Sequence, residues 1–216
     1  VEKILNQVGV TVLSVSRLPG ETNVNVRVKS RNGEYVIRIS CRRRELLVSN
    51  VFYNTAYSRG IPVPEVVLYD DSCSVIPFEY QVVKFVESES VDKSQVRNAG
   101  KALGSTLRKL HSISMHGFGT PIDLERWKHA SWLELLSKVY LHSDFMKART
   151  AVYSKKEVAQ IEKMTFENGS LEISDPKLIH GDVSINNCLF HQVISGMKLC
   201  ALIDPGTIIS GDPMFD

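Results

Sequence analysis

The chain has 216 residues, of which 43% are hydrophobic and 23% are charged. This composition is typical of soluble globular proteins and excludes disordered or fibrous ones, and the length allows one ordinary domain or two small lobes. No stretch approaches the ~20 consecutive apolar residues that span a bilayer, and the start lacks the basic-then-apolar run of a signal peptide. The four cysteines form no Cys-x-x-Cys pair, which argues against a zinc site or a disulfide framework. We therefore expect a cytoplasmic protein.

Charge is distributed unevenly along the chain, whose overall formal charge is +2. From Ser170 onward there are two basic and six acidic residues, a local charge of −4, so the first 169 residues carry +6. A basic first part suits nucleic-acid binding, but no aromatic-basic array or zinc-finger spacing supports that class. We therefore expect neither nucleic acid nor a membrane as a partner.

The first forty residues predict a short helix and then a three-stranded antiparallel meander. Residues 1–8 have helical spacing of apolar side chains, whereas valines alternate with polar residues over 10–15 and again over 24–28. Asn32-Gly33 is the strongest two-residue hairpin signal, so residues 35–39 are expected to form the return strand. The next expected elements are, in chain order, a helix over 45–59 closed by Gly60 and strands over 66–69 and 80–86.

Residues 87–90 have low hydrophobicity and are interpreted as a linker between an N-terminal lobe, residues 1–86, and a C-terminal lobe, residues 87–216. Beyond the linker the pattern becomes helical, and strand patterns return near the end. The expected elements there are a helix ending near His111 with Val96, Leu103, Leu107 and Leu110 on one face, helices near 131–142 and 155–165, and strands at 178–179, 188–190 and, after a Ser195-Gly196 turn, 199–203. This order predicts an α+β, two-lobed, protein-kinase-like fold.

Three polar residues near the end of the chain have the order and spacing that phosphoryl transfer requires. The reaction needs one carboxylate to orient and deprotonate an attacking hydroxyl, and it needs oxygen ligands for Mg²⁺. Asp182 and Asn187 lie five residues apart on one expected loop, and Asp204 follows the adjacent expected hairpin. The alternative, that these are ordinary turn residues near strand ends, is weakened because three residues match together.

At this point the chain resembles the aminoglycoside phosphotransferase family, whose relatives include choline, homoserine and methylthioribose kinases. The resemblance rests on His180-Gly181-Asp182 with Asn187, on Ile203-Asp204-Pro205-Gly206, and on Gly211-Asp212-Pro213 through Asp216. It extends to Pro19–Val28, which is similar to the family's nucleotide loop, and to Gly60–Glu65, which is similar to its proline-marked helix exit. Nearly the whole chain is covered.

The resemblance implies a role for each matched residue. Asp182 would be the catalytic base, and Asn187 and Asp204 would be Mg²⁺ ligands. His180 would brace the loop, and Asp212 would be a structural carboxylate rather than a catalyst.

Arg38 lies on the third expected strand, where kinases place a Lys that contacts the nucleotide phosphates. An Arg binds phosphate in bidentate fashion, although an ordinary exposed strand Arg is the alternative. Glu45 is the candidate helix carboxylate that orients Arg38. Only six residues separate the two, so either the helix begins at once or a segment near Ser40 and Cys41 is missing.

The expected adenine and phosphate contacts come from the family layout. The turn Gly20–Asn23 has one glycine and is no glycine-rich phosphate loop by composition, so Asn23 is assigned to the nucleotide by resemblance alone. The interlobe strand would offer its backbone to adenine at Val83, Lys84, Phe85 and Val86. No Gly-x-x-x-x-Gly-Lys-Ser/Thr motif is present, which excludes P-loop enzymes.

The predicted function is a Mg²⁺-dependent kinase that uses ATP, with GTP as the alternative nucleotide. Only six residues separate Asp204 from Gly211, too few for the activation segment of a protein kinase, so we expect a small-molecule acceptor. The resemblance favours an aminoglycoside and antibiotic resistance, and the acidic end of the chain suits a cationic acceptor. The open alternatives are choline, homoserine, methylthioribose or a glycated amine as the acceptor, and a catalytically inert nucleotide-binding module.

Family members continue beyond the position of Asp216, so we expect further helices of the C-terminal lobe to be missing here. The sequence does not indicate the oligomeric state.

Overall fold

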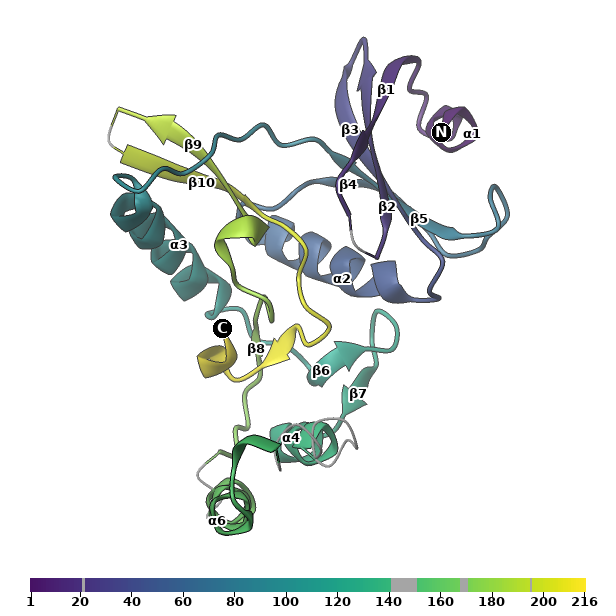
Figure 1. Ribbon diagram of the computed structural model, residues 1–216. Helices are drawn as coiled ribbons and strands as arrows, with labels where there is room; N and C mark the ends of the chain where they lie inside the picture. The colour runs from purple at the N-terminus through teal and green to yellow at the C-terminus, as the bar shows by residue number, and fades with distance from the viewer. Residues whose placement is uncertain (21, 141–150, 168–170, 195) are drawn as a thin grey trace. The chain divides into compact units, whose positions relative to one another are not determined.

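A computed structural model describes residues 1–20, 22–140, 151–167, 171–194 and 196–216 (Figure 1). Contacts within the chain group it into two compact units. The first joins Val1–Leu110 to Asp182–Gly206, and the second joins His111–Gly181 to Thr207–Asp216. The expected division between residues 86 and 87 stays a prediction. The expected turns at Gly20–Asn23 and Ser195-Gly196, and the last residues of the helix expected over 131–142, lie partly outside the described residues.

The first unit is built on a five-stranded antiparallel sheet with the strand order β1-β2-β3-β5-β4, and it also contains the two-stranded hairpin β9–β10. In Figure 1 this hairpin runs beside α3, against which β10 packs. The elements of the first unit are α1 (Glu2–Asn6), β1 (Val12–Leu18), β2 (Val24–Ser30), β3 (Gly33–Ser40), α2 (Glu45–Ser58), β4 (Val66–Asp70), β5 (Glu79–Lys84), α3 (Val96–Leu110), the 3₁₀ turn η1 (Ile185–Asn187), β9 (Cys188–Val193) and β10 (Gly196–Leu202).

The second unit combines helices with a sheet of short strands in the order β7-β6-β11-β8. Its elements are β6 (Phe118–Pro121), β7 (Trp127–His129), α4 (Trp132–Tyr140), α6 (Lys155–Phe166), β8 (Lys177–Leu178), β11 (Ser210–Gly211) and the 3₁₀ turn η2 (Pro213–Phe215). The sequence did not predict β6, β7 or β11, because strands of two to four residues are too short to show an alternating pattern. None of the described helices combines the length and the apolar character needed to cross a membrane.

The alternation along β3 decides what each face of the five-stranded sheet contacts. Ile37 belongs to a buried cluster that also contains Ile4 and Leu5 of α1, whereas its neighbour Arg38 reaches Tyr53 of α2. Successive side chains of a strand point to opposite faces, so α1 and α2 cover opposite sides of the sheet. The predicted meander and the α+β class are therefore confirmed.

Two details differ from the expectation. Ser30 pairs with Gly33, so the β2–β3 turn consists of residues 31 and 32, one residue earlier than Asn32-Gly33. In α3, Val96 is 56% exposed, whereas Ala99, Thr106 and Leu110 are buried. The buried stripe therefore begins one turn later than predicted, and the small residues Ala99 and Thr106 belong to it.

The start of α2 is fixed from outside the helix. Arg44, the residue before the first turn, has the left-handed φ of 67° and contributes no side-chain cap. The Glu79 carboxylate on β5 accepts the backbone N–H of Arg44 at 3.0 Å and that of Leu46 at 2.9 Å. These bonds satisfy donors that have no partner inside the helix, so α2 begins at Glu45 itself.

Candidate active site

The loop that carries Asp182 and Asn187 belongs to the first unit and is closed by contacts between these two residues. Asn187 Nδ2 donates to the Asp182 carbonyl oxygen at 2.9 Å and to Asp182 Oδ2 at 3.0 Å. The turn η1 produces this approach, since it reverses the chain between the two positions. Because the amide nitrogen is occupied by Asp182, the amide oxygen of Asn187 remains the group that can bind a metal.

Asp204 follows β10 and lies next to the same loop. The Ile203 N–H donates to the Asn187 carbonyl at 2.9 Å, which joins the end of the hairpin to the loop. Asp204 has a left-handed φ of 51°, and its side chain is 53% exposed. The structure therefore brings together the backbones of two residues that the sequence assigns to Mg²⁺.

Arg38 contacts Asp204 directly. Its Nη2 donates to Asp204 Oδ1 at 2.7 Å, and its side chain is only 11% exposed. Arg38 Nη1 also lies 3.5 Å from the hydroxyl of Tyr53. The expected phosphate-binding residue and an expected metal ligand thus form one ion pair within the first unit.

The expected pair between Arg38 and Glu45 is not formed. Ser40 Oγ donates to Glu45 Oε2 at 2.5 Å, so the carboxylate closes the turn before α2 instead. Within the described residues, the hydrogen-bonding partners of Arg38 are Asp204 and Tyr53. The assignment of Glu45 to the nucleotide site stays a prediction, but orienting Arg38 cannot be its role in this arrangement.

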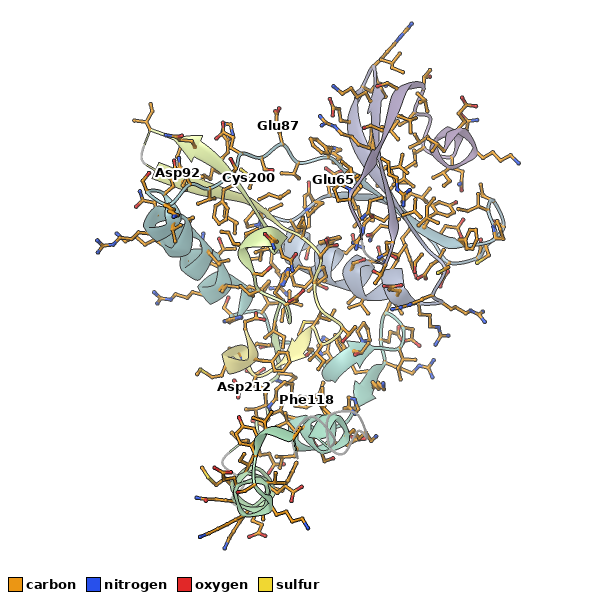
Figure 2. All side chains as sticks on the ribbon, in the orientation of Figure 1. Glu65, Glu87, Asp92, Phe118, Cys200 and Asp212 are labelled. Carbon is orange, nitrogen blue, oxygen red and sulfur yellow. The ribbon has the colours of Figure 1, made fainter. Side chains whose placement is uncertain are left out.

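The four residues expected to meet adenine differ in the backbone groups that they can offer. The Lys84 N–H donates to the carbonyl of Glu65, and the Phe85 N–H donates to the carbonyl of Glu34, both at 2.9 Å. Figure 2 labels Glu65, whose carboxylate also pairs with Lys84 Nζ at 2.8 Å. The N–H of Val86 has no hydrogen-bond partner within the described residues, so it is the donor that remains for a ligand.

The side chains of this segment are arranged differently from its backbone. Val83 is buried, with 4% exposure, and Phe85 lies under the Arg27 guanidinium, 3.8 Å from its ring centroid. Arg27 also donates to Glu34 at 2.6 Å, which fixes the cation above the ring. The ring of Phe85 is therefore held by a cation–π contact on one side.

Asn23 ends the turn between β1 and β2 and is half-buried. A Cβ at Gly20 would lie 2.6 Å from the Asn23 carbonyl oxygen, so only glycine allows this close approach. The Asn23 side-chain oxygen is shielded from solvent and has no hydrogen-bond partner among the residues described. The contact of Asn23 with a nucleotide stays a prediction.

In the second unit, Asp216 orders the residues that immediately precede Asp182 in the chain. Its carboxylate accepts the backbone N–H of His180 at 2.8 Å and that of Gly181 at 2.7 Å, and it lies 2.9 Å from Nε2 of His111. Burial raises the pKa of Asp216, but these hydrogen bonds outweigh it and hold the pKa below its usual value. The side chain is 1% exposed, so its hydrogen bonds replace those that water would make.

Sequence reasoning named Asp212 as the structural carboxylate and did not single out Asp216 or Tyr53. Asp212 accepts the Met214 N–H at 2.9 Å and caps η2, which fits a structural role. Asp216 ends the motif that begins at Gly211, but the residue type alone does not show which groups its carboxylate binds. Tyr53 has no sequence signal, because it lies among apolar residues of a buried helix.

The donor chemistry of the first unit fits Mg²⁺. The candidate ligands, the amide oxygen of Asn187 and the carboxylate of Asp204, are hard oxygen donors of the kind that this ion prefers. No cluster of three or more His, Cys, Asp or Glu residues occurs in the described parts of the chain. Mg²⁺ usually keeps several waters and binds substrate phosphates, so it needs only one or two protein ligands.

Comparison with models of known protein families shows the family to which the chain belongs. The model of the phosphotransferase enzyme family (APH) matches residues 14–216. The chain belongs to this family. The match includes all the candidate site residues, from Asn23 to Asp204, and the family resemblance expected from the sequence is confirmed.

Curated relatives are similar to this chain over part of their length. Acyl-CoA dehydrogenase family member 11 of Gallus gallus is 27% identical over 172 residues, and that of Rattus norvegicus is 24% identical over 173 residues. Each alignment covers 74% of this chain but 20% of the relative, so the chain spans about one fifth of the curated relatives that it matches.

Solved structures share the fold at low sequence identity. Aminoglycoside phosphotransferase APH(4)-Ia matches with a TM-score of 0.73 and 17% identity, covering 98% of this chain and 72% of its own. A thermostable mutant of the same enzyme in a ternary complex with ADP and hygromycin B matches with a TM-score of 0.72 and 17% identity over 99% and 72%. A putative fructosamine-3-kinase from Thermobifida fusca matches with a TM-score of 0.66 and 18% identity over 98% and 74%. The chain therefore has the protein-kinase-like fold of aminoglycoside phosphotransferases, as predicted.

Proposed function

We propose that this chain is a phosphotransferase that moves the γ-phosphoryl group of a nucleotide to a hydroxyl group of a small molecule. The observation that carries the proposal is the connected set Asp182, Asn187, Asp204 and Arg38 within one unit. A proton acceptor, oxygen ligands for a metal and a phosphate-binding cation are the groups that this reaction needs. Membership of the phosphotransferase enzyme family supports the same conclusion.

Each residue has a separate task in this proposal. Asp182 accepts the proton of the acceptor hydroxyl as the bond from that oxygen to the γ-phosphorus forms. The bond from phosphorus to the bridging oxygen breaks, and the nucleoside diphosphate leaves with the electron pair. Asn187 and Asp204 would hold Mg²⁺, which neutralises phosphate charge when bound. Arg38 binds the phosphates through its guanidinium group.

The nucleotide is proposed to be ATP, with GTP as the alternative. The free N–H of Val86 is the donor for the base, and the buried Val83 supplies an apolar contact beside it. Lys84 and Phe85 contribute carbonyl groups or side chains, because their N–H groups are already used. Two structural neighbours are complexes with ADP or with AMP-PNP, which supports a nucleotide site in the same fold.

The acceptor is proposed to be an aminoglycoside-type molecule, as the family resemblance favours, with a role in antibiotic resistance. Structural neighbours bound to hygromycin B support this choice. A metabolite acceptor is the second candidate, and a different observation favours it. The curated relatives are vertebrate proteins named for acyl-CoA chemistry. Their identity to this chain, 22–27%, is higher than the 13–17% of the similar aminoglycoside phosphotransferase structures.

The test is Mg²⁺-dependent nucleotide consumption with ATP and with GTP against a panel of acceptors. The panel contains aminoglycosides, choline, homoserine, methylthioribose, a glycated amine and an acyl-CoA that carries a hydroxyl group. We expect one class to stimulate turnover, and we expect Asp182→Asn to abolish that stimulation. Because this chain spans one fifth of its curated relatives, the same panel should also be run on the longest natural form of the protein.

The results separate the alternatives. Nucleotide binding without stimulation by any acceptor would favour the inert nucleotide-binding module. Absence of nucleotide binding would contradict both. The cytoplasmic location remains part of the proposal, and it agrees with four cysteines that are all unpaired.

A further inference from the structure

Tyr53 is a buried residue of α2 whose hydroxyl lies between two residues of the proposed phosphate and metal site. The residue is 2% exposed. Its hydroxyl oxygen accepts the backbone N–H of Asp204 at 3.1 Å, and Nη1 of Arg38 lies 3.5 Å from the same oxygen. A tyrosine phenol is neutral at physiological pH, and its oxygen can accept hydrogen bonds from both of these donors.

The bond to Asp204 acts at a strained position of the backbone. Asp204 has a φ of 51°, in the left-handed region that residues other than glycine adopt only when their surroundings hold them there. On its N-terminal side, the Ile203 N–H is bonded to the Asn187 carbonyl. The Tyr53 hydroxyl supplies the partner of the next N–H, so the two bonds together hold the backbone from which the Asp204 side chain projects.

The α2 helix offers Arg38 no carboxylate. Glu45 is the sole acidic residue of α2 in the sequence, and it is bonded to Ser40 at the first turn. Tyr53 lies two turns further along the helix, and its hydroxyl is the polar group of α2 that approaches the guanidinium. A neutral oxygen orients the guanidinium without neutralising it, so the charge of Arg38 stays available for phosphate once Asp204 binds a metal.

We propose that Tyr53 is a positioning residue that holds Asp204 for the metal and Arg38 for the nucleotide phosphates through one hydroxyl group. This inference rests on the proposed function and adds a residue of α2 to the same site. Tyr53 is not a catalytic residue, because it acts through the two residues that would contact the metal and the nucleotide.

The test is the effect of Mg²⁺ on nucleotide binding in the Tyr53→Phe variant, measured by titration calorimetry with ADP as the probe. The quantity of interest is the ratio of ADP affinities with and without Mg²⁺. We expect this ratio to fall about fivefold or more relative to the wild type, since the variant leaves the Asp204 N–H without its partner. The ring is retained, so the packing of α2 should persist.

Tyr80→Phe is the matched control. Tyr80 is also fully buried in the first unit, and its hydroxyl makes two bonds, to Asp70 at 2.7 Å and from Gln7 at 2.5 Å. Removing that hydroxyl should lower the melting temperature while leaving the Mg²⁺ ratio unchanged. A purely structural role of Tyr53 would give this same pattern.

The outcomes distinguish this inference from the function on which it rests. A wild-type chain that fails to bind ADP would contradict the proposed function. A wild type whose affinity depends on Mg²⁺, together with a Tyr53→Phe variant of identical dependence, would overturn the role of Tyr53 alone. If Tyr53→Phe does not fold, difluorotyrosine at position 53 weakens the acceptor while keeping its shape, when the titration is run at a pH below the pKa of the fluorinated phenol. An unchanged Mg²⁺ ratio in that protein would overturn the inference equally.

Discussion

The loop that carries Asp182 and the corner between β3 and α2 each contain two residues that the sequence assigned to the site, and the two residues contact each other only in the loop. Asp182 and Asn187 lie five residues apart, and one short 3₁₀ turn brings the amide onto the carboxylate. Arg38 and Glu45 lie seven residues apart, yet Arg38 pairs with Asp204, 166 residues away. The comparison teaches that a short separation in sequence favours a contact between two side chains within one turn. Across a strand-to-helix corner, the direction in which each side chain points decides whether the two residues meet.

The largest expected effect concerns the loop. Asp182→Asn should lower turnover by about 10³-fold, because the amide cannot accept the proton of the acceptor hydroxyl, while nucleotide affinity persists. Initial rates and calorimetric titrations measure the two quantities separately. Asp212→Asn is the control, since an Asn can also cap η2, and it should retain turnover. Full turnover in Asp182→Asn would remove the loop from the mechanism.

The second effect concerns Asp204, which lies next to the Asp182 loop and pairs with Arg38 of β3. Asp204→Ala should weaken binding of the Mg²⁺–nucleotide complex by about 10- to 100-fold, because it removes a proposed metal ligand and the partner of Arg38. Asp123→Ala is a matched control, because Asp123 also pairs with an arginine, Arg126, at 2.6 Å. Calorimetry in Mg²⁺ measures the change, and equal losses in the two variants would show that the effect is unspecific.

Substitutions of Glu79 and Glu45 test the corner between β3 and α2. Glu79→Gln should lower the free energy of unfolding by about 1–3 kcal/mol, because a buried carboxylate that caps α2 through two backbone N–H groups is replaced. Glu45→Gln should change nucleotide affinity little, since Glu45 is bonded to Ser40 rather than to Arg38. Urea unfolding and nucleotide titration measure these results. A large loss of nucleotide affinity in Glu45→Gln would restore the pair expected from the sequence.

The smallest expected effect is on acid stability. The pKa of Asp216 is lower in the folded chain than in the unfolded chain, so its contribution to stability is present above about pH 4 and is lost as the pH falls through the folded value. Asp216→Asn should remove roughly 1–2 kcal/mol at neutral pH and flatten the decline of stability below pH 4. Urea midpoints measured from pH 7 to pH 2 show the slope. Glu87→Gln is the control, because Glu87 is an exposed carboxylate, labelled in Figure 2, that makes no hydrogen bond or ion pair within the described residues, and this change should leave that slope nearly intact.

Local patterns predicted most of the first unit. The alternating valines of β2, the apolar run of α2 and its end before Gly60 all describe structure within one element, where side-chain periodicity is sufficient. The strands of the second unit were missed where they are two to four residues long, because their pairing comes from distant segments rather than from alternation.

Some residues of the candidate site could be identified from the sequence and others could not. The family motifs pointed to Asp182, Asn187 and Asp204, and the structure joins them through hydrogen bonds of their own segments. Tyr53 and Asp216 were not identified, since each acts on backbone N–H groups that are remote in sequence. Every residue except proline has a backbone N–H, so the residue type of the donor does not indicate which side chain will accept its hydrogen bond.

The most direct test of the account is the binding of ADP to the wild-type chain with and without Mg²⁺, measured by titration calorimetry. No acceptor needs to be known for this measurement. The account predicts that ADP binds and that Mg²⁺ strengthens binding, because Asn187 and Asp204 supply oxygen ligands beside the phosphate-binding Arg38. Absence of binding, or an affinity that does not respond to Mg²⁺, would contradict the proposed site.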